Sequence, residues 1–104
     1  MKYILEMKHM KSAIYYSDGS AYYEDYNDMD EFDLEIVKNY KFRIGDCVRI
    51  NDTIVVYKIL AVSPDSKYQY KIGRYDQGFG TNRIEEKDLV PISDFERNIM
   101  KYNL

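Results

Sequence analysis

Cysteine and histidine are nearly absent from this 104-residue sequence, which holds one of each, Cys47 and His9. A lone cysteine forms no disulfide within its own chain, so a reducing environment is the simpler expectation. A zinc site needs about four ordered ligands, and a nucleophilic site needs a base and an orienting group. The sequence offers neither, so we expect Cys47 to be a small buried hydrophobe and His9 a strand-edge residue. It therefore predicts a protein that is not an enzyme and holds no metal and no cofactor.

Long apolar runs are also missing. No stretch approaches the roughly 18 consecutive apolar residues that span a bilayer. The first ten residues, MKYILEMKHM, interrupt every apolar run with charge and contain no apolar core of a signal peptide. We therefore expect a cytoplasmic protein without membrane contact.

The charges that are present are unevenly distributed. The formal net charge is -3, yet residues 1–40 hold nine acidic and four basic residues, whereas residues 41–104 hold nine acidic and eleven basic ones. Twelve tyrosines accompany no tryptophan, and lysine, asparagine and isoleucine are common. This usage fits an A+T-rich coding source such as a low-GC bacterium, its phage or a mobile element.

The first 40 residues predict a small sheet followed by a helix. Period-two alternation over residues 2–9 indicates a strand, and Asp18-Gly19 is typical of a two-residue type I′ hairpin turn that pairs Tyr15 with Tyr22. An acidic amphipathic helix follows, with a capping box that starts at Asp28. Its expected apolar stripe consists of Met29, Phe32, Ile36, Val37 and Tyr40.

Residues 41–104 predict short strands and a final helix. Turn signals at Gly45-Asp46 and Asn51-Asp52 flank a strand over residues 47–50. Longer strands are expected over 53–63 and within 67–76, and residues 83–92 read as a strand, a turn over 85–88 and a last short strand. A Ser-x-x-Glu capping box predicts a short helix over residues 93–104.

Two motifs in this half support a resemblance. The pattern F-x-x-GD-x-V-x-I begins at Phe42, and R-I-x-E-x-DLV-P-I begins at Arg83. Over about residues 41–92 the chain resembles a Src-homology-3-like small β-barrel. The predicted fold class is α+β and mostly β: a single domain over residues 1–104, with a hairpin sheet and acidic helix in 1–40, the barrel in 41–92 and a C-terminal helix in 93–104.

The stretch EDYNDMDEFDLE, residues 24–35, provides the first functional hypothesis. It contains seven carboxylates and no basic residue. Leu34 falls outside the expected apolar stripe, among charged residues, and is a candidate interface anchor. The predicted partner-binding residues are Tyr22, Glu24, Asp25, Asp28, Asp30, Glu31, Asp33, Leu34 and Glu35. The same pattern also fits an ordinary solvated helix face.

Carboxylates beside tyrosines imitate phosphates and compete for a nucleic-acid-binding groove. In style the chain resembles small acidic phage-encoded inhibitors, including DNA mimics and anti-CRISPR proteins. That resemblance implies a basic nucleic-acid-handling host protein, such as a defence nuclease, as the partner in the host cytoplasm.

A basic and aromatic face on the barrel provides the alternative hypothesis. Tyrosines that stack on bases and cations that meet phosphates are typical of nucleic-acid-binding surfaces. The candidate residues are Arg49, Lys58, Lys71, Arg74, Tyr75 and Arg83. Packing of a soluble barrel explains the same alternation, and the small positive excess of this half argues against binding to a polyanion.

Overall fold

The computed structural model describes residues 13–77, 79–80 and 82–92 of the chain. The strand predicted over residues 2–9, His9 and the helix predicted over residues 93–104 lie outside the described residues. Within them the chain is mostly β, with antiparallel strands and a short α-helix. The coarse fold class predicted from the sequence, α+β and mostly β, is therefore confirmed.

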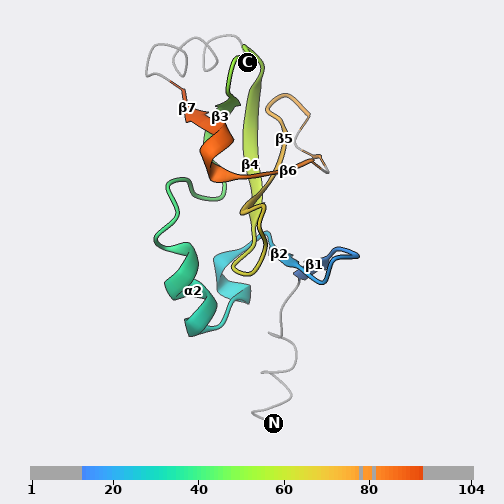
Figure 1. Ribbon diagram of the computed structural model, residues 1–104, viewed down its shortest axis with the longest axis vertical. Helices are drawn as coiled ribbons and strands as arrows, with labels where there is room; N and C mark the ends of the chain where they lie inside the picture. The colour runs from blue at the N-terminus through green and yellow to red at the C-terminus, as the bar shows by residue number, and fades with distance from the viewer. Residues whose placement is uncertain (1–12, 78, 81, 93–104) are drawn as a thin grey trace.

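Seven strands form one antiparallel sheet organised around β4 (Figure 1). They are β1 Ala13–Tyr15, β2 Ala21–Tyr23, β3 Cys47–Ile50, β4 Val56–Val62, β5 Tyr70–Arg74, β6 Asn82–Ile84 and β7 Leu89–Pro91. One side of β4 pairs with β5; its other side pairs with β3 near its start and with β2 at Val62. The sheet is completed by β1 on β2, β6 on β5 and β7 on β3.

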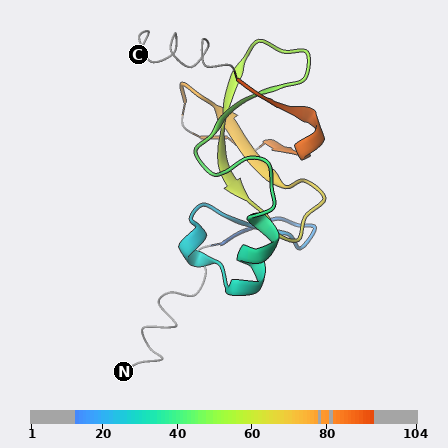
Figure 2. The same ribbon diagram turned by 90° about the vertical axis from the view of Figure 1, so that its left-hand side faces the viewer.

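The helical elements are short. The 3-10 turn η1 Tyr26–Asp28 precedes the α-helix α2, which covers Glu31–Val37, and a second 3-10 turn, η2 Glu86–Asp88, lies between β6 and β7. In both ribbon views the β1–β2 hairpin, η1 and α2 form one end of the molecule, and β3, β6 and β7 lie toward the other (Figure 2). The sheet therefore connects the acidic segment to strands β3–β7 through the last residues of β4.

The hairpin turn differs from the predicted one by one residue. Tyr15 pairs with Ala21 and Ile14 with Tyr22, and the Tyr16 amide donates to the Ser20 carbonyl at 3.0 Å. The loop therefore consists of the three residues 17–19 rather than of two. Of these three, Gly19 has a positive φ, at 90°, while Asp18 does not. A type I turn followed by a glycine in the left-handed region is the usual three-residue hairpin, whereas a type I′ turn needs two positive φ angles. The predicted register was therefore wrong, and the shift leaves Tyr15 exposed.

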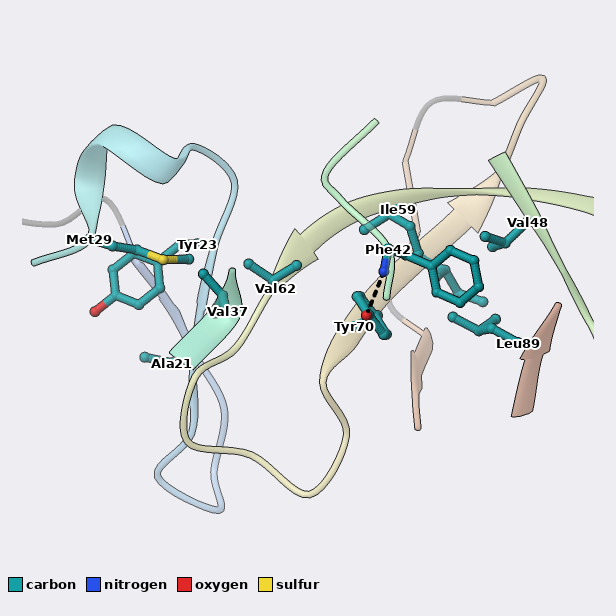
Figure 3. Packing of buried hydrophobic residues seen from close by; sticks show 11 residues of the cluster. Ala21, Tyr23, Met29, Val37, Phe42, Val48, Ile59, Val62, Tyr70 and Leu89 are labelled. Atoms are coloured by element: carbon teal, nitrogen blue, oxygen red, sulfur yellow. Dashed lines mark hydrogen bonds between the residues drawn. The ribbon is translucent and has the colours of Figure 1, made fainter. Parts of the chain in front are cut away.

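The hydrophobic core follows β4 from one end of the molecule to the other. Figure 3 shows Met29, Val37 and Val62 packed together at the α2 end, and Phe42, Val48, Ile59, Tyr70 and Leu89 at the other end. Val62, Ile59 and Val48 are at most 1% exposed. Both halves of the chain contribute to one contiguous cluster, so the acidic helix is positioned by the same core as the strands.

Tyrosine hydroxyls connect the loops to this core. The Tyr70 hydroxyl accepts a hydrogen bond from the Phe42 amide at 3.1 Å and donates one to Glu86 Oε2 at 2.6 Å. Glu86 Oε2 also accepts from the Lys41 amide at 2.9 Å, so η2 is attached to the segment that precedes β3. Burial, helped by the Glu86 carboxylate, raises the pKa of Tyr70 well above its usual range. Tyr70 is therefore neutral at physiological pH and serves as a structural bridge.

Backbone closely covers the outer face of β5 at Gly73. A Cβ atom placed on Gly73 would lie 2.2 Å from the carbonyl oxygen of Phe79, and one placed on Gly80 would lie 2.5 Å from Gly73 Cα. No side chain fits between these segments, so the loop after β5 folds back onto the strand only because both positions are glycine.

Candidate protein-binding surface

The acidic stretch folds as two short helical turns, each capped by an aspartate. Asp25 accepts a hydrogen bond from the Asn27 amide at 2.9 Å and begins η1. Asp30 accepts from the Asp33 amide, also at 2.9 Å, and begins α2. The predicted cap at Asp28 was therefore wrong. Met29 has extended backbone angles, φ -93° and ψ 148°, which end η1 before α2 begins.

The late start of α2 changes which side chains face the core. Met29 is buried from outside the helix, and Val37 and Leu34 pack inward from it. At about 100° per residue, Phe32 then points away from Val37 and toward solvent, where it is 75% exposed. Leu34 is partly buried against the core, so the prediction that it lies outside the apolar stripe was wrong, and so was the prediction of Phe32 as part of the buried stripe. The signal that could have identified Phe32 is the choice between Asp28 and Asp30 as the helix cap.

Most of the predicted acidic residues in the segment that contains Phe32 are exposed. Those that are exposed are Glu24, Asp25, Asp30, Glu31 and Glu35, and with Phe32 they form what we call the acidic surface. Asp28 and Asp33 are partly buried. Two members, Asp25 and Asp30, also serve as caps, and Glu35 forms an ion pair of 2.6 Å with Lys38.

Tyr22 does not belong to this surface. Its side chain is 0% exposed, its hydroxyl donates to the backbone carbonyl of Tyr68, and that hydroxyl lies 3.0 Å from Ser66 Oγ. The prediction of Tyr22 as a partner-binding residue was wrong, because β2 is covered on both faces and its three residues, Ala21, Tyr22 and Tyr23, are all buried.

The position of α2 is fixed by tyrosines from both sides. The Tyr26 hydroxyl accepts a hydrogen bond from the Ile44 amide at 2.9 Å, and the Tyr40 hydroxyl donates to the Ser63 carbonyl at 2.7 Å. A hollow of about 340 Å³ remains between η1, α2 and the segment before β3. It is lined by Tyr26, Leu34, Glu35, Val37, Lys38 and Arg43. The hydrogen bonds of Tyr26 and Tyr40 therefore hold α2, and with it Phe32, in a defined place.

The alternative basic residues are distributed over the sheet. Arg49, Lys58, Lys71 and Arg83 alternate with buried residues and so share the outer face of β3–β6. That face is interrupted where the backbone of Phe79 and Gly80 covers Gly73.

Three of the alternative candidates are already engaged. Arg83 forms an ion pair with Asp18 at 2.9 Å, and Arg74 lies 3.6 Å from Asp76. Tyr75 is partly buried and lines a hollow with Ile54. The structure therefore does not bring the six residues together as one open basic patch.

Cys47 is partly buried, rather than the fully buried residue expected. Among residues 13–77, 79–80 and 82–92, no group of three or more His, Cys, Asp or Glu side chains is placed to hold a metal ion. In the same part of the chain, no helix is long and apolar enough to cross a membrane.

Comparison of the chain with family models, with curated proteins and with solved structures found no match.

Proposed function

We propose that this protein is a non-enzymatic protein-binding module whose acidic surface occupies a basic groove on a nucleic-acid-handling protein. The observation that carries the proposal is Phe32, a large aromatic side chain that is 75% exposed on the outward side of α2 among carboxylates. Leaving such a ring in water forgoes burial worth about 1.5–3 kcal/mol, which a partner recovers. Aromatic anchors of this kind, surrounded by polar residues, often dominate protein interfaces.

The two parts of the acidic surface have different roles in this proposal. Exposed carboxylates attract a positively charged partner over a distance of about 8 Å at physiological salt, and so accelerate encounter. Phe32 then provides the desolvated centre of the complex and slows dissociation. Because α2 is held by the core and by the tyrosine hydroxyls, little conformational entropy is lost when the partner binds.

The sharper form of the proposal is a DNA-mimicking inhibitor from a phage or a mobile element, with an anti-CRISPR-like action on a defence nuclease. The carboxylates of Glu24–Glu35 take the place of phosphates, and the partner's cationic groove loses access to its nucleic acid. Such an inhibitor acts by occupancy and needs no catalytic group.

We also propose that residues 41–92 are a Src-homology-3-like barrel that serves as the scaffold. The order β7-β3-β4-β5-β6, antiparallel throughout, supports this proposal, as does the 3-10 turn η2 between β6 and β7. The nucleic-acid-binding function considered for this barrel has less support, because Arg83 and Arg74 form ion pairs with Asp18 and Asp76.

The proposal is tested by affinity capture from a low-GC bacterial lysate with three immobilised proteins: the parent, Phe32→Ala, and Phe79→Ala as a matched control. Phe79 is 69% exposed but lies outside the acidic surface. We expect a basic protein bound by the parent and by Phe79→Ala but lost from Phe32→Ala. Equal capture by all three proteins, or retention of the parent on a DNA column in place of any basic protein, would contradict the proposal.

A further inference from the structure

Three tyrosine rings and one carboxylate converge on the guanidinium of Arg83. Its Cζ atom lies 4.2 Å from the ring centroid of Tyr16, 5.4 Å from that of Tyr68 and 5.8 Å from that of Tyr22. Its Nη1 atom donates to Asp18 Oδ2 at 2.9 Å. A cation that is surrounded by aromatic faces and also paired with a carboxylate meets the two main requirements for guanidinium recognition.

Each wall of this site is held by contacts that do not involve Arg83. Tyr22 is fully buried, and its ring packs edge-to-face on Tyr16 with centroids 5.1 Å apart. Its hydroxyl donates to the Tyr68 carbonyl, which ties Tyr22 to the loop that carries Tyr68. The Asp18 carboxylate accepts from the Ser20 amide at 3.0 Å and from the Ser20 hydroxyl at 2.6 Å. The site is therefore expected to keep its shape when the arginine is removed.

We propose that Tyr16, Tyr22, Tyr68 and Asp18 form a preformed receptor for a guanidinium group, and that the chain fills this receptor with its own Arg83. The ligand class is arginine-like: a planar cation that stacks on aromatic faces and forms a charged hydrogen bond at its edge. The four receptor residues come from the β1–β2 hairpin and the loop before β5, whereas the ligand comes from β6. The contact thus fastens the hairpin to the far edge of the sheet.

Occupancy of the receptor by Arg83 explains why one residue of each predicted binding surface is unavailable to a partner. Tyr22, expected on the acidic side, and Arg83, expected on the basic side, bind each other. A tethered ligand acts at an effective concentration in the millimolar range or above, so an added guanidinium ion at low concentration cannot displace Arg83 from the parent. Truncation of Arg83 should open the same receptor to that ion.

The test is chemical rescue of Arg83→Ala, followed by thermal unfolding in millimolar guanidinium chloride and in sodium chloride at the same concentration. This guanidinium concentration is far below the molar range that denatures proteins. We expect Arg83→Ala to lower the melting temperature by several degrees and guanidinium to restore part of that loss. Arg74→Ala, which removes an exposed guanidinium that lies 3.6 Å from Asp76, is the control and should show no restoration.

A second measurement uses NMR, and its first part needs only the parent protein. In the parent, ring currents from three tyrosines should move the NMR signals of the Arg83 side chain away from those of Arg74. Titration of guanidinium into Arg83→Ala should move the ring signals of Tyr16, Tyr22 and Tyr68. Ordinary Arg83 signals in the parent would overturn the proposal, and so would a folded Arg83→Ala whose melting temperature and ring signals respond equally to both salts.

Discussion

Replacement of Tyr70 by phenylalanine tests how the sheet around β5 is attached to η2 and to the segment before β3. The ring of Tyr70 is fully buried and stays in place in Tyr70→Phe, so the variant removes one oxygen atom from the core. That oxygen accepts from the Phe42 amide and donates to Glu86. A buried amide without an acceptor costs about 1–3 kcal/mol, and a hydrogen bond to a charged group contributes about 1.5–3 kcal/mol. In the variant, Glu86 still accepts the hydrogen bond from the Lys41 amide, so its carboxylate keeps one partner. We therefore expect the free energy of unfolding to fall by about 2–4 kcal/mol in total.

The assay is equilibrium unfolding in urea, monitored by circular dichroism. The expected result is a lower midpoint at an unchanged slope, and a melting temperature lower by about 10 °C or more. Tyr15→Phe is the matched control, because Tyr15 is 68% exposed and its replacement should change stability by no more than about 0.5 kcal/mol. If the two variants unfold at the same urea concentration, Tyr70 is not the bridge between Phe42 and η2.

Three further predictions follow from the same contacts. Stability should fall as pH rises above about 10, because burial raises the pKa of Tyr40 to about 12 and the unfolded chain therefore loses the Tyr40 proton at a lower pH than the folded chain does. Tyr40→Phe removes this proton, so its midpoint of urea unfolding should fall less steeply with pH than that of the parent. Asp30→Ala should lower the free energy of unfolding, measured in urea, by about 1 kcal/mol, and Asp28→Ala should lower it by less than about 0.5 kcal/mol. Equal losses would refute Asp30 as the cap of α2. Gly73→Ala should cost about 1–3 kcal/mol by the same assay, because its Cβ meets the Phe79 carbonyl, and an unchanged midpoint would contradict that packing.

Local signals in the sequence were sufficient for the β-rich half. β3 begins and ends where turn residues and β-branched residues predicted, and η2 covers most of the turn expected over residues 85–88. Glycine at position 45 has a φ of 95° and Asp52 a φ of 66°, which are the backbone angles that these turn residues tolerate. β4 begins at Val56 and not at Thr53, because its pairing with β3 starts at Arg49 opposite Val56.

The acidic segment was predicted less well because two local solutions compete there. Asp28 and Asp30 both fit the pattern of a helix cap, and the choice between them decides whether Met29 belongs to the helix. Burial of Met29 in extended backbone decides the choice, and it depends on contacts with residues distant in the sequence. The same limit applies to the hairpin, where Asp18-Gly19 fits a two-residue or a three-residue loop until Tyr22 is buried.

Binding kinetics against the captured basic protein, at several salt concentrations, test the central claim most directly. Glu24 and Glu31 are exposed carboxylates of the acidic surface, and Asp52 and Asp76 are exposed carboxylates outside it. The account predicts slower association and a weaker salt dependence when Glu24 and Glu31 become glutamine, and faster dissociation for Phe32→Ala. Asp52 and Asp76 changed together to asparagine should leave both rates unchanged. If this control and the two acidic-surface variants bind with the same kinetics as the parent, the acidic surface is only a solvated face and the account is contradicted.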